Sequence, residues 1–353
     1  MRVKLSGHGS IGSLDEGFRV EVRRTIDNLN KPLGSMGLLE SVAEQVCLVQ
    51  HTLSPRLSHP CHLLFGGDHG IEREGVSASP REVTWQQMVN FTRGGGGVNM
   101  FCRQHGFELR IIDVGVDHDL SACPGIVDRK IARGTDNFLY GPAMSEEQFL
   151  LAADIGAEQV DLCYREGCNI VSIGEMGIAN TSAASLWMHF LGGVALEECV
   201  GVGSGLDAAG LQHKRRVLQQ AAATFRDAAG SDDATAALPY FGGFEMAAAV
   251  GAMLRAAQQG MIIIVDGFIM GACMLAASII DSNVTGYAVY GHCGGERGHR
   301  RLLALLGATP LLDIGLRLGE GTGALCAYPL IDSAVRMVCE MSSFSESAVT
   351  KYF

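Results

Sequence analysis

The sequence predicts an α/β protein with a parallel sheet of about six strands that helices cover on both faces. The first observation is a recurring unit: a short apolar or β-branched run, a glycine-rich turn and a helical pattern. The second is composition, because hydrophobic residues make up 47% of the 353 residues and charged residues only 18%, as in a large packed core. The third is that most strand candidates are continuously apolar, which is typical of strands buried on both faces.

The expected elements follow one another along the chain. The strand candidates are 61–65, 109–114, 169–173, 261–265, 284–289 and 310–314. Helical patterns occupy most of the intervals, including 80–93, 145–166, 211–225, 243–259 and a helix from 269. Two more helices, at about 14–29 and from about 323 to the C-terminus, have no strand between them and their chain end. We expect a small helical domain of residues 1–30 with 323–353 and a large domain of 31–322, although these patterns leave open whether the two ends meet.

Charge and cysteine content narrow the class of protein. The chain has 27 Lys and Arg against 38 Asp and Glu, a formal charge of −11, which argues against non-specific binding to nucleic acid or an anionic membrane. The 11 cysteines lie in apolar surroundings without a CxxC pair, as reduced thiols of a cytoplasmic protein do. The apolar run 261–280 would carry Asp266 into hydrocarbon at about 3 kcal/mol if it crossed a membrane. A strand, a turn and a helix explain this run without that penalty.

Several expected strand ends run into glycine plus an acid: FGGDHG (65–70), SIGEMG (172–177), VDGF (265–268) and, just past the last strand, LRLGEG (316–321). Glycine lets the backbone turn sharply and approach a ligand closely, and successive N–H groups suit phosphate. Because ligands bind at the carboxyl ends of parallel strands, we expect the site at this edge. Each segment alone is weak evidence for a site, because any parallel α/β protein has glycine-rich turns. A parallel sheet does not need an acid at several of these turns, so together they indicate a functional site.

Glu320, with glycine on both sides, is the foremost catalytic candidate. An apolar pocket, here Leu316 and Leu318, would raise its pKa and make it a usable base near neutral pH. The alternative is a carboxylate at the N-terminus of the helix that begins near Gly323, and the local sequence does not decide between them. Glu175 similarly would bind ribose hydroxyls or cap the helix containing Asn180.

The remaining motifs bear on a phosphate site and a metal site. GVGSGLD (201–207) does not directly follow a good strand, which disfavours a dinucleotide site, but it leads into the helix with Lys214. Lys214 is either a phosphate ligand or, by default, a solvated helix lysine. The histidines and cysteine of 292–299 do not provide a convincing set of four zinc ligands, and no nucleophilic triad motif appears. We therefore expect neither a metal nor another cofactor.

Eight segments, in this order, resemble the nicotinate-nucleotide–dimethylbenzimidazole phosphoribosyltransferase family. They are DNLNKPLGSMGLLE (27–40), GGDHGIEREGVSASPREVTWQQMVNFTRGG (66–95), DVGVD (113–117), GPAMS (141–145), IGEMGIANTSAA (173–184), GGFEMAAAVGAML (242–254), VDGFI (265–269) and LRLGEGTGA (316–324). The resemblance covers nearly the whole chain. It implies a Rossmann-like parallel sheet, a small helical domain built from both chain ends, and a homodimer.

The resemblance also implies an activity: transfer of phosphoribose from nicotinate mononucleotide to dimethylbenzimidazole, in the synthesis of the lower-ligand nucleoside of cobalamin. Matched to the family's motifs, Glu320 falls on the general base. Glu175 and Lys214 fall near the ribose phosphate, and Ser79 and Gln87 fall on the base pocket. The glycine-rich segments complete the expected substrate-binding set with Gly174, Gly177, Gly203, Asp266 and Leu318.

The chain departs from the common family pattern at three places, and the first touches a loop near the substrates, so the resemblance specifies the reaction type more closely than the acceptor base. GHCGGE (291–296) stands where members more often have Ser or Ala near the start and a Ser-Ala-Glu run. Leu38 replaces a usual Arg, and Thr322 replaces a more frequent Ser. Two alternatives therefore remain: the same transfer to another azole, a purine or a phenol, and a non-catalytic nucleotide-binding protein of the same fold.

Overall fold

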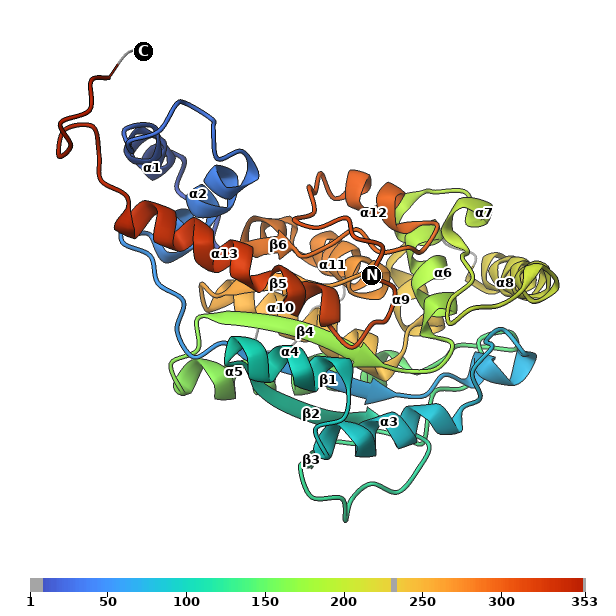
Figure 1. Cartoon of the computed structure of the whole chain (residues 1–353). Helices are drawn as coiled ribbons and strands as arrows, with labels where there is room; N and C mark the ends of the chain where they lie inside the picture. The colour runs from blue at the N-terminus through green and yellow to red at the C-terminus, as the bar shows by residue number, and fades with distance from the viewer. Residues whose placement is uncertain (1–8, 230–233, 352–353) are drawn as a thin grey trace.

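Six parallel strands form one sheet across residues 9–229 and 234–351, which the computed structural model describes (Figure 1). The expected fold class is confirmed. The order in the sheet is β3-β2-β1-β4-β5-β6. The strands are β1 Cys61–Gly67, β2 Glu108–Gly115, β3 Ile126–Asp128, β4 Ile170–Met176, β5 Ile262–Val265 and β6 Ala288–Tyr290. All neighbours pair parallel, so their carboxyl ends meet at one edge.

Alternate residues of the strands feed two hydrophobic clusters, one on each face of the sheet. On β5, Ile263 and Val265 belong to one cluster, and Ile262 and Ile264 to the other. The first face is covered mainly by α5 Glu146–Arg165, α6 Asn180–Gly192, α8 Ala208–Ala229, α9 Ala237–Phe241, α10 Phe244–Gln258, α11 Phe268–Ile280 and α12 His299–Leu305. The second is covered mainly by α2 Leu38–Gln50, α3 Glu82–Thr92, α4 Gly97–His105 and α13 Thr322–Glu340, with α1 Glu16–Asp27 outside them.

Two sequence expectations about strands are wrong. Segment 310–314 is not a strand and makes only an isolated bridge from Leu312 to His292; Pro310 cannot donate to a ladder, and the residues after it are largely solvated. Most of 284–289 is the 3₁₀ helix η3 Ser282–Tyr287, which Asp281 caps through the N–H of Asn283 at 3.0 Å. The sixth strand is instead the short edge strand β3, which has too few residues to give a sequence signal.

The two ends of the chain meet. The N–H of Asn30 donates to the carbonyl of Ser342 at 2.9 Å, and the N–H of Phe344 donates to that of Asn28 at 2.9 Å. Helix α1 packs on α2, which packs on α13; Figure 1 shows α1 and α2 at one end of the molecule, where α13 ends after running outward from beside the sheet. The parts of the expected small domain at residues 1–8 and 352–353 lie outside the described residues. Helix α2 belongs to the expected large domain of residues 31–322 but packs with these terminal helices. The boundary at residue 30 therefore stays a prediction.

The apolar run 261–280 forms β5 and α11, as expected. In the described parts of the chain, no helix is long and apolar enough to span a membrane. Short elements complete the chain: the 3₁₀ helices η1 Gly70–Glu74 and η2 Ala234–Ala236 and the helix α7 Leu196–Cys199.

Helices α5 and α10 cross in direct backbone contact. A Cβ on Gly156 would overlap the carbonyl oxygen of Ala248, and a Cβ on Gly251 would overlap that of Ala153. Neither neighbour is a side chain that can rotate away, so this crossing requires glycine on both helices.

We therefore predict that Gly156→Ala destabilises the protein by about 3 kcal/mol, because the helices must separate to admit the methyl group. Thermal melting followed by circular dichroism measures this loss. Gly210→Ala in α8 is the matched control, because its Cβ would meet first the flexible end of Leu206. An unchanged melting temperature for Gly156→Ala would contradict the proposed backbone contact.

Candidate active site

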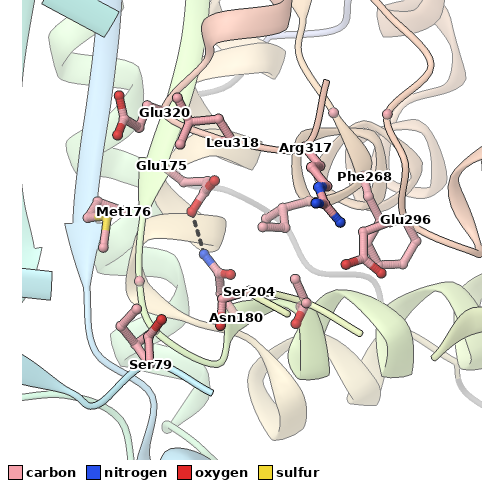
Figure 2. A pocket seen from close by; sticks show the side chains of 18 of the residues that line it. Ser79, Glu175, Met176, Asn180, Ser204, Phe268, Glu296, Arg317, Leu318 and Glu320 are labelled. Carbon is pink, nitrogen blue, oxygen red and sulfur yellow. Dashed lines mark hydrogen bonds between the residues drawn. The ribbon is translucent and has the colours of Figure 1, made fainter. Parts of the chain in front are cut away.

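A pocket opens at the carboxyl edge of the sheet, where the segments after β1, β4, β5 and β6 meet the loop before α13 (Figure 2). Its lining includes most of the expected residues, namely Ser79, Gln87, Glu175, Gly177, Gly203, Asp266, Leu318 and Glu320. Gly174 and Lys214 are not lining residues but lie directly behind the wall. The structure thus brings together segments that are far apart in the sequence.

Glu320 enters the pocket on a left-handed stretch of backbone. Its φ is +62°, between Gly319 at +87° and Gly321 at +80°. A Cβ on Gly321 would overlap the ring of His62 on β1, and a Cβ on Gly174 of β4 would lie 2.5 Å from the carbonyl oxygen of Glu320. The two strands therefore pack directly against this loop, and glycine at these positions makes that approach possible.

The carboxylate of Glu320 is buried, with 6% of the residue exposed. Burial raises its pKa, and the backbone N–H groups of Val98 and Gly97 at the start of α4 oppose the rise. Oε2 accepts from Val98 N–H at 3.1 Å. The expected capping alternative assigned this carboxylate to the helix near Gly323. That role falls to Asp266, which accepts from Ala324 N–H at 2.9 Å.

Glu175, at the end of β4, lies beside Glu320. Burial raises the pKa of Glu175 to about 8, with contributions from the charges of Glu245, Asp266 and Glu320, while the side-chain amide of Asn180 opposes the rise. Asn180 Nδ2 donates to the carboxylate (Figure 2). This contact is to a side chain rather than to the backbone N–H groups of α6, so Glu175 is not a conventional helix cap.

Asp266 follows β5 and is the third buried acid of this region. We call Glu175, Asp266 and Glu320 together the acidic wall. Burial raises its pKa, and His292, whose Nε2 lies 3.6 Å from Oδ1, opposes the rise. With Glu296 across the pocket, four carboxyl groups line this cavity. Their mutual repulsion is reduced where one of them keeps its proton, as the raised pKa of Glu175 indicates.

Lys214 on α8 is fully buried, so the default interpretation of a solvated lysine is wrong. Its Nζ donates to Thr181 Oγ1 at 2.8 Å, and a Cβ on Gly203 would lie 3.0 Å from the same hydroxyl. Burial lowers the pKa of Lys214 to about 8, and the negative charge of Glu296 opposes this. An ammonium, a hydroxyl and a glycine loop thus converge behind one end of the pocket.

Ser79 and Gln87 line the opposite side, where α3 faces the pocket. Gln87 Oε1 accepts from Asn90 at 3.0 Å, which fixes the orientation of its amide group. Leu318 lies at the mouth and is 62% exposed, so it lines the pocket without burying Glu320 from solvent on its own.

Comparison with known proteins identifies the family. The model of a phosphoribosyltransferase family matches residues 11–349. A Bacteroides fragilis nicotinate-nucleotide–dimethylbenzimidazole phosphoribosyltransferase is 54% identical over 339 residues, 96% of this chain and 97% of its own. A Dechloromonas aromatica protein of the same name is 48% identical, over 95% of this chain and 97% of its own. A solved structure of that enzyme from Thermus thermophilus superposes with a TM-score of 0.89 at 35% identity, covering 96% of this chain and all of that one.

The chain belongs to the nicotinate-nucleotide–dimethylbenzimidazole phosphoribosyltransferase family. The pocket of this family member contains two charged residues that sequence reasoning missed. Arg317 is exposed and lines the mouth, and Figure 2 shows it with Glu296 across the pocket from Glu320. Arg317 is the only Lys or Arg among the lining residues that the structure describes. The sequence could have indicated Arg317 as a pocket residue, because it lies three residues before Glu320 in LRLGEG.

The histidines near the pocket have partners other than a metal. Across the described residues, no group of three or more His, Cys, Asp or Glu side chains is placed to hold a metal ion. His292 instead contacts Asp266, and His299 accepts from the backbone N–H of Gly294 at 2.8 Å. The histidines of 292–299 are therefore part of the wall's packing.

The raised pKa of Glu175 predicts a pH-dependent effect of Glu175→Gln on stability. Below about pH 4.5 the carboxyl is protonated in both folded and unfolded chains, whereas above it the unfolded chain alone ionises until about pH 8. The folded state of the wild type therefore loses stability as pH rises through this window. Gln, which stays neutral, should raise the melting temperature by several degrees at about pH 9 and by little at about pH 4. An equal offset at both pH values would contradict this assignment.

Proposed function

We propose that this protein transfers phosphoribose from nicotinate mononucleotide to dimethylbenzimidazole and releases nicotinate, with Glu320 as the base. The observation that carries the proposal is a buried carboxylate between two chemically different ends of one pocket. Figure 2 shows Met176 and Ser79 on the same side of the pocket as Glu320, while Arg317 lies across from it, and Gln87 is a further lining residue. This arrangement suits a neutral aromatic acceptor on one side and an anionic nucleotide on the other.

The chemistry asks little of the protein beyond positioning and one proton acceptor. The pyridine nitrogen of nicotinate mononucleotide is already cationic, so nicotinate leaves without a proton from a general acid. One benzimidazole nitrogen attacks the anomeric carbon from the opposite face, which converts a β-nucleotide into an α-riboside. As the ring gains positive charge its other N–H becomes acidic, and the Glu320 carboxylate takes this proton. Holding both substrates in line supplies the remaining rate enhancement.

The acidic wall supports this reaction electrostatically. In their charged forms, Asp266 and Glu320 favour a positive charge in the pocket, both on the departing pyridinium and on the anomeric carbon as its bond stretches. A protonated Glu175 is a hydrogen-bond donor, which suits a ribose hydroxyl and avoids a third negative charge beside the base.

The phosphate end rests on Lys214, Thr181, Gly203 and Arg317. Lys214 is held at 2.8 Å from Thr181, so its charge is fixed behind the wall, and Gly203 leaves room for a close approach. Arg317 adds a fork of donors at the mouth. A dianionic phosphate bound here would also restore the charge of Lys214, since the partner favours the ammonium form.

Homodimerisation and a cytoplasmic location are further parts of the proposal. The family resemblance supports the homodimer, and light scattering of the purified protein tests it directly. All 11 cysteines are free thiols, which supports a reducing compartment.

The test of the reaction is incubation with nicotinate mononucleotide and dimethylbenzimidazole, followed by mass analysis and NMR of the product. We expect nicotinate and the α-nucleotide in equal amounts. A panel containing another azole, a purine and a phenol then defines the acceptor class. Nucleotide binding without release of nicotinate from any acceptor mixture would overturn the proposal and favour a non-catalytic binder.

Glu320→Gln should lower kcat by roughly 10²- to 10⁴-fold, because the amide cannot accept the ring proton. Calorimetric binding of nicotinate mononucleotide and the circular dichroism spectrum should stay close to wild type. Glu340→Gln, an exposed change at the far end of α13, is the matched control. Turnover of Glu320→Gln within about twofold of wild type would exclude Glu320 as the base.

Arg317→Ala should raise the KM for nicotinate mononucleotide about tenfold, because a charge-assisted hydrogen bond to phosphate is lost. The KM for dimethylbenzimidazole should change little. Arg300→Ala, which removes an exposed arginine that is paired with Asp313 and does not line the pocket, controls for the loss of surface charge. Equal effects of the two variants on nucleotide KM would show that Arg317 does not bind the phosphate.

A further inference from the structure

The carboxylate of Glu320 is in contact with the first turn of helix α4 as well as with the pocket. Oε2 accepts from Val98 N–H at 3.1 Å, and the N–H of Gly97 also favours the charged form of the carboxylate. These two residues begin α4, after Gly96 at its N-cap. First-turn N–H groups have no partner within their helix and carry partial positive charge, so they stabilise an anion.

Gly97 makes this contact possible because it has no side chain. A Cβ there would lie 2.9 Å from Leu318 Cδ2, 3.2 Å from Thr322 Cγ2 and 3.3 Å from Glu320 Oε2. Gly97 does not have a positive φ, so its backbone would accept any residue. The requirement at this position is therefore the space that the Glu320 loop occupies.

The start of α4 is itself fixed by Asn99. Its Oδ1 accepts from Gly96 N–H at 2.8 Å, and its Nδ2 donates to the carbonyl of Phe91, in the last turn of α3, at 2.9 Å. Helix α3 also carries Gln87, which lines the pocket. The buried side chain of Asn99 thus links α3, which we expect to contact the acceptor, to the N-terminus of α4, which binds the Glu320 carboxylate.

We propose that Gly97 is a positioning residue for the transfer reaction: it admits the Glu320 carboxylate to the N-terminus of α4, which fixes one carboxylate oxygen and leaves the other to accept the ring proton. This inference rests on the proposed role of Glu320 as base. Gly97 acts through Glu320 and has no assigned contact with substrate. Asn99 supports the same contact by fixing the first turn of α4.

Other groups that face Glu320 do not supply this support. Asp266, at the end of β5, raises the pKa of Glu320 by repulsion, and Glu175 on β4 is a further acid beside it. His62 on β1 is neutral near pH 7, because burial lowers its pKa to about 3. Withdrawing the α4 N–H groups would therefore raise the pKa of Glu320 further, and the base would be charged only at higher pH.

The test is the pH profile of kcat/KM for Gly97→Ala. We expect its acid limb to move up by roughly half to one pH unit, and kcat on that limb to fall about three- to tenfold, with the KM for nicotinate mononucleotide unchanged. Gly17→Ala is the matched control: Gly17 N–H donates at 2.8 Å to Asp15, and a Cβ there would lie 3.1 Å from that carboxylate. Helix α1 is remote from the pocket, so this variant should keep the wild-type profile.

Two parallel variants separate the possible outcomes. A wild-type profile for Gly97→Ala, with Glu320→Gln inactive, overturns the positioning role and leaves the proposed function intact. Wild-type-like turnover in Glu320→Gln would overturn the role of Glu320 as base, and with it the positioning role of Gly97. Asn99→Ala removes the hydrogen bonds to Gly96 and Phe91 that fix the first turn of α4, and it should shift the acid limb in the same direction. If Gly97→Ala does not fold by circular dichroism, an unshifted profile in Asn99→Ala overturns the proposal.

Discussion

The site depends on one backbone constraint, the left-handed run of Gly319, Glu320 and Gly321 packed against the ends of β1 and β4. A non-glycine residue in this conformation costs on the order of 1 kcal/mol or more, so the surrounding structure must hold it there. The ring of His62 and the bare Cα of Gly174 supply the surface against which the loop rests. If the loop relaxed, the carboxylate would leave both the pocket and α4.

Two of the buried carboxyl groups in the pocket are stabilised by the N-termini of helices. Asp266 is buried at the start of α13 and Glu320 at the start of α4, so each carboxylate accepts from backbone N–H groups that would otherwise lack partners. Glu175 lacks such a helix end and has the amide of Asn180 as its partner; burial raises its pKa to about 8, and the amide only partly opposes the rise. The pocket thus combines two carboxyl groups held by backbone N–H groups with a third, Glu175, whose pKa of about 8 favours the protonated form near neutral pH.

The sequence predicted the fold class and the edge that carries the site, because alternating apolar runs and glycine-acid turns are local patterns. Lys214 shows where local patterns fail. Its helix position gave no sign of burial, which depends on the Thr181 contact and on packing from other elements. Local patterns also missed β3, which has only three residues, and wrongly predicted a strand at 310–314, where the apolar residues lie in a loop. The link from Glu320 to Val98 joins residues 222 positions apart and has no sequence signature.

The central claim is that Glu320 is held by α4 on one oxygen and takes the ring proton of the acceptor on the other. A crystal structure with dimethylbenzimidazole and nicotinate bound tests it most directly. We expect a ring nitrogen that carries hydrogen to lie within about 3 Å of the Glu320 oxygen not bonded to Val98, with the hydrogen bond from Val98 intact. A ring whose nitrogens face Glu175 or solvent, with Glu320 turned away, would contradict it.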